Sequence, residues 1–221
     1  MSFSKAKKVF WRLVLFLLSS NLYSSCIPQK RSPNNWTHFS RPCINGNETA
    51  LTKKVYPIKQ RKANDCWFAC YGTLLSWKEQ RRIPYEELYD SIGIKWQVIV
   101  NENNGIDFPN QKIFFEEMNL GYFGPANYIY EGYVSMLEEH GPLWISMGSH
   151  KKSFNHARVL LKLSCGKSMK RTYFYLFDPA KDRIEKWNAK KFFKHFENEA
   201  KEINEEGYVI EEWRYQIIYI K

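Results

Sequence analysis

The chain has 221 residues, of which 44% are hydrophobic and 17% aromatic, and this composition excludes an intrinsically disordered protein. Its formal net charge is +10, but no compact basic stripe interleaved with aromatic residues is present, so we expect no nucleic-acid partner. Four of the excess positive charges lie in the first 25 residues, so a chain that begins near Cys26 would carry a net charge of +6.

Residues 1–25 have the pattern of a secretory signal peptide. Lys5, Lys7, Lys8 and Arg12 make the first part basic, residues 13–18 are purely apolar, and serines follow. The apolar run is far shorter than the about 20 residues needed to cross a bilayer. We therefore expect an exported protein, either secreted or held in the cell envelope. The alternative is an amphipathic or buried N-terminal helix.

The end of this segment is similar to a bacterial lipoprotein cleavage site. Ser24 and Ser25 precede Cys26, although Tyr23 occupies the position that is usually leucine. Two outcomes stay open here: a lipid on Cys26 that anchors the protein to a membrane, and ordinary cleavage nearby.

The spacing of the cysteines at positions 43, 70 and 165 does not assign them a role. An exported protein can form disulfides, so one pair such as Cys43–Cys165 is compatible with the sequence. The alternative is that Cys43, Cys70 and Cys165 all stay reduced, and that Cys70 and Cys165 pack as small hydrophobic residues.

Residues 26–54 are polar and rich in proline and asparagine, which is typical of a linker or an irregular N-terminal arm. A folded domain is expected from residue 55 to residue 221, and it begins with a short extended segment, Val55–Ile58. The first half of this domain has helical patterns and one loop-rich stretch, 97–112. The expected helices are Cys66 to about Lys78, Pro84–Ile92, Lys112–Asn119 and Tyr130–His140.

After residue 142 the patterns become those of strands. The expected strands are Leu143–Met147, His156–Leu163, Tyr173–Phe177 and Arg214–Ile220, with one more helix over Asn188–Asn198. Helices followed by strands indicate an α+β fold with an antiparallel sheet.

Cys66 lies at the start of the first expected helix, where Asn64 and Asp65 offer N-cap chemistry. Free amides and the positive end of the helix dipole stabilise a thiolate at such a position, and the thiolate is the reactive form of cysteine. Gln60 stands six residues earlier. Its side-chain amide and the N–H of Cys66 would form a natural pair of donors for a developing oxyanion.

A base for this thiol must come from elsewhere in the sequence. His156 begins an expected strand and Asp178 ends the next one, so antiparallel pairing would let the aspartate orient the imidazole. His150 is a rival base near Gly148 and Ser149, and we rank it below His156. Trp67 and Trp96 are candidates to line a substrate cleft.

These residues, in this order, resemble papain-like cysteine peptidases. The resemblance rests on Gln60, Cys66-Trp67, His156-Ala157 and Asp178-Pro179, and it covers about residues 55–196. It is nearest to a bacterial branch that includes plant-pathogen effector proteases and bacteriocin-leader peptidases. It implies a papain-like α+β fold, with the nucleophile at a helix start packed on a C-terminal antiparallel sheet. It also implies an acyl-enzyme mechanism in which Gln60 helps to form the oxyanion hole.

The sequence also departs from papain itself. The glycine-rich approach to the cysteine is replaced by residues 61–65, and the Asn-Ser-Trp motif is absent. The spacings Cys66-x3-Cys70 and His150-x5-His156 do not match zinc sites, so we expect no metal and no cofactor.

The sequence therefore predicts an exported, monomeric cysteine peptidase that hydrolyses peptides or proteins through Cys66, His156, Asp178 and Gln60. Two alternatives stay open. The same site would suit a cell-wall amidase or an acyltransferase, and an inactive domain of this fold would suit an envelope lipoprotein that binds a partner.

Overall fold

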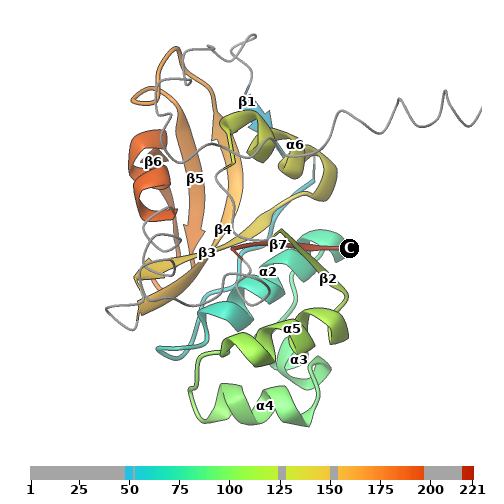
Figure 1. Cartoon of the computed structure of the whole chain (residues 1–221). Coiled ribbons are helices and arrows are strands. Elements are labelled where there is room, and N and C mark those ends of the chain that lie inside the picture. The colour runs from blue at the N-terminus through green and yellow to red at the C-terminus, as the bar shows by residue number, and fades with distance from the viewer. Residues whose placement is uncertain (1–47, 52, 124–127, 150–153, 197–215) are drawn as a thin grey trace, which may run out of the picture.

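The computed structural model describes residues 48–51, 53–123, 128–149, 154–196 and 216–221 (Figure 1). The helices are α2 (Cys66–Glu79), α3 (Tyr85–Ser91), α4 (Ile94–Asn101), α5 (Phe108–Glu117) and α6 (Tyr130–His140), and residues 189–196 are also helical. The strands are β1 (Glu48–Ala50), β2 (Leu120–Phe123), β3 (Leu143–Ser149), β4 (Phe154–Ser164), β5 (Tyr173–Asp178), β6 (Arg183–Asn188) and β7 (Ile217–Ile220).

The strands form one antiparallel sheet whose order is β2-β7-β3-β4-β5-β6. The short strand β1 lies off this path and pairs with the end of β4, where Glu48 is opposite Ser164. Helices of the first half followed by this sheet make an α+β fold, so the predicted fold class is confirmed.

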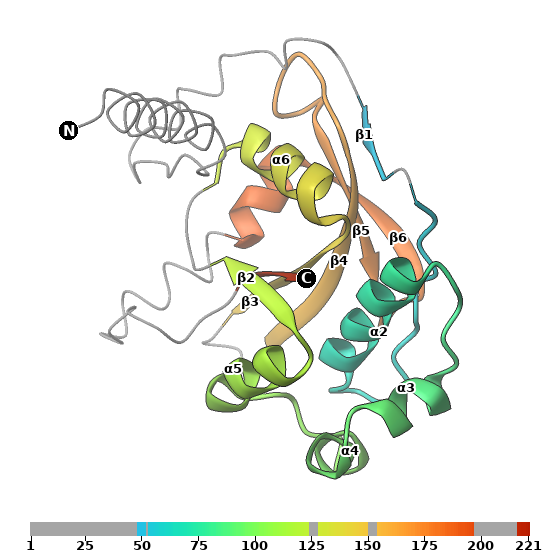
Figure 2. The same ribbon diagram turned by 90° about the vertical axis from the view of Figure 1, so that its right-hand side faces the viewer.

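The sheet is covered on both faces, and Figure 2 shows α2 on one side of it and α6 on the other. Alternation along the strands explains this arrangement, because successive side chains point to opposite faces. In β4, Val159 joins the core on the side of α2, whereas Leu160 joins the second core beneath α6. The pairing of β4 with β5 shifts register between Leu160 and Lys162, so Leu161 and Leu163, although two residues apart, belong to different cores. The sheet therefore separates two hydrophobic cores.

Helix α2 is buried on nearly every side between the sheet and the smaller helices. Two of its buried hydroxyl groups bind the extended segment that precedes the helix. Thr73 Oγ1 accepts a hydrogen bond from the Ile58 N–H at 2.9 Å, and Ser76 Oγ donates to the Tyr56 carbonyl at 2.7 Å. These bonds hold the segment that leads to Gln60 along the side of α2.

Gly72 lets α3 approach α2 closely. A Cβ atom at this position would lie 2.3 Å from Cδ2 of Leu88 and 2.7 Å from Cδ1 of Ile58. Both atoms belong to buried side chains of the core, so any larger residue must displace them.

The predicted helices α2, α3, α5 and α6, the helix after residue 188, and the strands β3, β4 and β5 are all present, with small shifts at their ends. Of the predicted strand over 214–220, residues 214 and 215 lie outside the described residues, and β7 forms the remainder. Four elements were not predicted. They are β1, which lies inside the predicted arm, α4, which replaces part of the predicted loop 97–112, β2 and β6.

Cys165 is disulfide-bonded, whereas Cys66 and Cys70 are free thiols. The alternative in which Cys165 stays reduced is therefore wrong, and its partner lies outside the described residues. Among the helices that the structure describes, none has the length and apolar character needed to span a membrane.

Candidate active site

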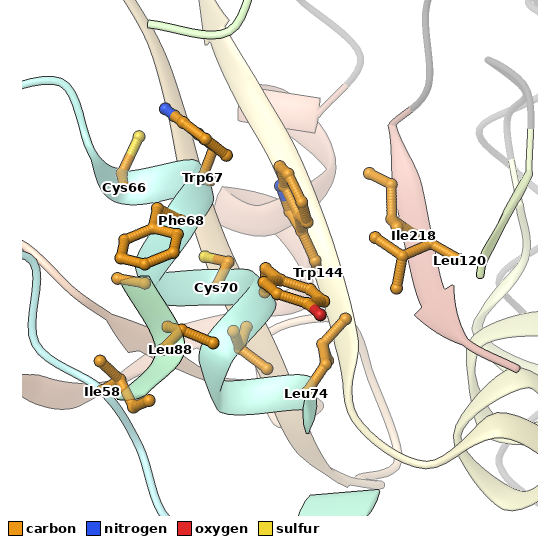
Figure 3. Close-up of a cluster of buried hydrophobic side chains, with 14 of the residues drawn as sticks. Ile58, Cys66, Trp67, Phe68, Cys70, Leu74, Leu88, Leu120, Trp144 and Ile218 are labelled. Atoms are coloured by element: carbon orange, nitrogen blue, oxygen red, sulfur yellow. The ribbon is translucent and has the colours of Figure 1, made fainter. Parts of the chain in front are cut away.

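The thiol of Cys66 stands at the first turn of α2, as the sequence predicts. Asp65 occupies the N-cap position, but its side chain makes no cap hydrogen bond to the helix. Figure 3 shows Cys66 at the end of the helix, with the indole nitrogen of Trp67 turned to the same side as the sulfur. The start of α2 thus presents its amides to Cys66 without a carboxylate cap.

His156 and Asp178 reach the same place from two neighbouring strands. His156 lies on β4 opposite Met147 of β3, and Asp178 is the last residue of β5. The His156 Nε2 atom lies 2.7 Å from Asp178 Oδ1, and His156 also makes a side-chain hydrogen bond with Cys66. Because Nε2 faces Asp178, Nδ1 is the nitrogen available to the sulfur. The imidazole therefore stands between the thiol and the carboxylate.

The carboxylate of Asp178 is buried and fully engaged. Besides His156, Oδ1 accepts a hydrogen bond from the Ala180 N–H at 3.1 Å. The second oxygen accepts from Nε of Arg158 at 3.1 Å, and Nζ of Lys181 lies 3.5 Å from it. The Arg158 guanidinium also lies 5.0 Å from the ring centre of Trp187, in a cation–π arrangement. Sequence reasoning missed Arg158, although it stands two residues after His156 and so shares a face of β4.

These contacts shift two pKa values in opposite directions. Burial lowers the pKa of His156, but the hydrogen bonds with Asp178 and Cys66 outweigh burial and raise it above its ordinary value. Burial raises the pKa of Asp178, but the hydrogen bond to His156 and the charge of Arg158 outweigh it and lower the pKa well below its usual range. Both shifts favour the charged forms, a carboxylate beside an imidazolium, and such a pair suits a histidine that transfers protons.

Gln60 lines the same groove as Cys66, and a backbone hydrogen bond joins it to the residue that follows β5. Its N–H donates to the carbonyl of Pro179, the residue after Asp178, at 3.1 Å. Its side-chain Nε2 donates to the carbonyls of Lys62 at 2.8 Å and Ala63 at 3.2 Å. In this structure the side-chain amide therefore binds its own loop. A hydrogen bond to a substrate oxygen must replace one of these two.

The four predicted catalytic residues line one groove of about 460 Å³. Its walls come from the start of α2, the loop before α5, and strands β3, β4 and β5. The other lining residues are Ala63, Asn64, Trp67, Gly105, Ile106, Gln111, Trp144, Ser146, Ala157, Arg158, Ala180 and Lys181.

Trp67, the candidate cleft residue, is among the residues that line this groove, and so is Trp144 of β3, which the sequence analysis did not name. Within the described part of the chain, the indole nitrogen of each is buried and has no hydrogen-bond partner. The prediction for Trp96 is wrong. Its side chain is only 1% exposed, packs edge-on against Phe114 and donates to Glu117 at 2.6 Å, so it belongs to the core.

Cys26 and His150 lie outside the described residues, so the predictions about them stay predictions. In the stretches of chain that the structure describes, no three His, Cys, Asp or Glu side chains form a group that could hold a metal ion.

Comparison with known proteins adds one match. A family model described as papain-like cysteine protease AvrRpt2 matches residues 50–197, which include the whole groove. No curated protein matches the chain.

Proposed function

The chain belongs to the AvrRpt2 family of papain-like cysteine proteases, and we propose that it hydrolyses peptide bonds through a Cys66–His156–Asp178 mechanism. Family membership makes the chain a cysteine peptidase of the bacterial branch, with peptides or proteins as substrates. The proposal adds the roles of the individual residues, export from the cell, and action as a monomer.

The first half of the reaction forms a thioester. The Cys66 thiolate attacks the carbonyl carbon of the scissile bond, and the negative charge moves to the carbonyl oxygen. His156, protonated on the nitrogen that faces the sulfur, then gives its proton to the leaving amine as the C–N bond breaks. The acyl group stays on Cys66, and the amine product leaves.

The second half returns the enzyme to its starting state. Neutral His156 takes a proton from a water molecule as the water oxygen attacks the thioester carbon. The C–S bond then breaks, and the thiolate and the imidazolium are restored beside each other. Asp178 keeps its charge throughout and orients the ring through Nε2.

The oxyanion of both steps needs donors. The N–H of Cys66 and the amide of Gln60 are the proposed pair, and catalytic hydrogen bonds of this kind often form only in the complex with substrate.

One observation carries the proposal: the 2.7 Å contact between His156 and Asp178, on an imidazole that is also hydrogen-bonded to Cys66, at the wall of an open groove. The test compares wild-type protein with Cys66→Ala on denatured protein, a peptide library and cell-wall sacculi, with products identified by mass spectrometry. We expect peptide-bond cleavage that Cys66→Ala abolishes while circular dichroism shows an unchanged fold.

Other outcomes identify the alternatives. Release of fragments from sacculi without peptide cleavage would mean a cell-wall amidase. No turnover, together with slow alkylation of Cys66 that does not depend on His156, would mean a non-catalytic binding domain. Hydrolysis that persists in Cys66→Ala would end the proposed mechanism.

Export is supported by the basic and apolar pattern of residues 1–25 and by the disulfide at Cys165, since such bonds persist mainly outside the reducing cytosol. Mass spectrometry of the mature protein tests it. A new N-terminus near residue 26 supports export, and an added lipid mass on Cys26 means membrane anchoring. An intact N-terminus in protein recovered from inside the cell contradicts export.

A further inference from the structure

The carboxylate of Asp65, next to the proposed nucleophile, binds the loop before α2 and does not bind the helix. Its side chain is 1% exposed and accepts three hydrogen bonds. Oδ2 accepts from the Arg61 N–H at 3.1 Å and from the Tyr85 hydroxyl at 2.9 Å, and Oδ1 accepts from the Lys62 N–H at 3.1 Å. The loop that links Gln60 to Cys66 is thus folded around one buried negative charge.

This orientation matters because an aspartate at the N-cap usually accepts from the first amides of its own helix. Such a cap would bring a second negative charge beside the Cys66 thiolate and would occupy amides that can stabilise an oxyanion. The side chain of Asp65 makes no cap bond to α2, so its charge is directed to the other side of the loop.

The loop before α2 also carries Gln60, whose side-chain amide is one of the two proposed oxyanion donors. The Lys62 peptide N–H binds Asp65, and the Lys62 carbonyl accepts from Gln60 Nε2 at 2.8 Å. The position of the Gln60 amide therefore depends on a residue that Asp65 holds directly. Outside the loop, the ammonium of Lys62 binds the carbonyls of Val100 and Asn101 at the end of α4, at 2.9 and 3.1 Å.

We propose that Asp65, held by Tyr85, is a positioning residue that sets the loop so that the Gln60 amide and the Cys66 N–H reach the same substrate oxygen. This inference rests on the proposed function. It assigns no chemistry to Asp65 itself, which does not touch the reacting atoms. Its effect is confined to steps in which an oxyanion forms.

Two reactions of the Cys66 sulfur distinguish a positioning role of Asp65 from a role in activating the thiolate or in maintaining the fold. Alkylation by iodoacetamide needs the Cys66 thiolate but forms no oxyanion. Attack on a peptide carbonyl needs the thiolate and also needs donors that stabilise the oxyanion. A residue that positions the oxyanion donors affects the second reaction only. A residue that activates the thiolate, or that merely maintains the fold, affects both.

The experiment uses three variants of the full chain. Asp65→Asn removes the charge, and Tyr85→Phe removes one donor to it while keeping the ring, which packs on Phe68 and beneath Arg61. Tyr89→Phe is the matched control, because it removes a hydroxyl from the same helix that binds Asn101 and not Asp65. Peptide hydrolysis, iodoacetamide alkylation of Cys66 and inhibition by a peptide aldehyde are measured for each.

We expect kcat to fall about 10- to 100-fold in Asp65→Asn and about 3- to 10-fold in Tyr85→Phe, less than the loss of an oxyanion donor itself. KM and the alkylation rate should stay within about twofold of wild type, because neither depends on the oxyanion. Binding of the aldehyde, which forms an oxygen-bearing adduct with the thiol, should weaken in parallel with kcat. Tyr89→Phe should match the wild type.

An unchanged kcat in Asp65→Asn and Tyr85→Phe overturns the inference, and so does an alkylation rate that falls with kcat. If Asp65→Asn does not fold, the comparison of Tyr85→Phe with Tyr89→Phe decides the question alone. The proposed function fails in a different way: the wild type would then cleave no peptide at all.

Discussion

The imidazole of His156 and the guanidinium of Arg158 share a single carboxylate. Nε2 of His156 lies 2.7 Å from one oxygen of Asp178, and Nε of Arg158 lies 3.1 Å from the other. The two side chains stand two residues apart on β4 and so lie on the same face of the strand. Asp178 therefore raises the pKa of His156, while the nearby positive charge of Arg158 lowers it.

Asp178→Asn should lower both the rate and the upper end of the active pH range. The imidazolium donates the proton to the leaving amine, and it exists only below the pKa of His156. Loss of the carboxylate lowers that pKa, so the alkaline limb of kcat/KM should move to lower pH. We expect kcat to fall about 10²-fold or more. The pH profile of peptide hydrolysis tests this, and an unmoved limb would contradict it.

Arg158→Met should move the alkaline limb of the kcat/KM pH profile to higher pH. Removing the positive charge relieves its repulsion of the imidazolium, so the pKa of His156 rises and activity extends to higher pH. Lys181→Met is a matched control that also removes a cation near Asp178. Lys181 is 47% exposed and lies 3.5 Å from the carboxylate, so solvent should make its effect smaller. A larger shift in Lys181→Met than in Arg158→Met would refute this ordering.

Gln60→Ala should lower kcat about 10²-fold with little change in KM, because it removes a donor to the oxyanion. Gln111→Ala is the control, since Gln111 lines the same groove but donates to the Ile106 carbonyl. Steady-state kinetics on one peptide compares them. Equal losses in the two variants would mean that Gln60 is only part of the groove wall.

Gly72→Ala should destabilise the fold despite the higher helix propensity of alanine. The added methyl group would displace Leu88 and Ile58, and overpacking of this kind costs about 1–3 kcal/mol. Gly105→Ala makes the same change where no atom lies within 4 Å, so its unfolding free energy should change by less than about 0.5 kcal/mol. Urea denaturation of both variants gives the comparison, and a Gly72→Ala as stable as the wild type would show that the core yields at little cost.

The elements predicted from sequence are those whose side-chain pattern matches their burial. Helix α6 and strand β4 show periodicity, and strand β3 is a short apolar run that is buried on both faces, so all three were found. Helix α4 was missed because it exposes apolar residues, with Ile94 79% and Val98 46% exposed, so it has no amphipathic pattern. Strand β6 was missed because it is the last strand on the sheet path and is rich in charged residues.

The sequence pointed to those site residues that have both a suitable side-chain chemistry and a suitable order in the chain. Gln60, Cys66, His156 and Asp178 line one groove because a helix start, two strand ends and a preceding segment converge there. The prediction for Trp96 was wrong because the neighbouring sequence does not distinguish a tryptophan that packs in the core from one that lines a cleft. Asp65 was read as a helix cap, and only coordinates reveal that its carboxylate turns back to the loop.

Among the described strands, β7 comes last in the sequence, yet it does not lie at the edge of the sheet. β7 lies between β2 and β3, and β2 joins the sheet through β7. A nascent or truncated chain without residues 217–220 would therefore lack an interior strand, and the core beside α2 would lose Ile218 and Ile220. Such a chain cannot complete the sheet that carries His156 and Asp178.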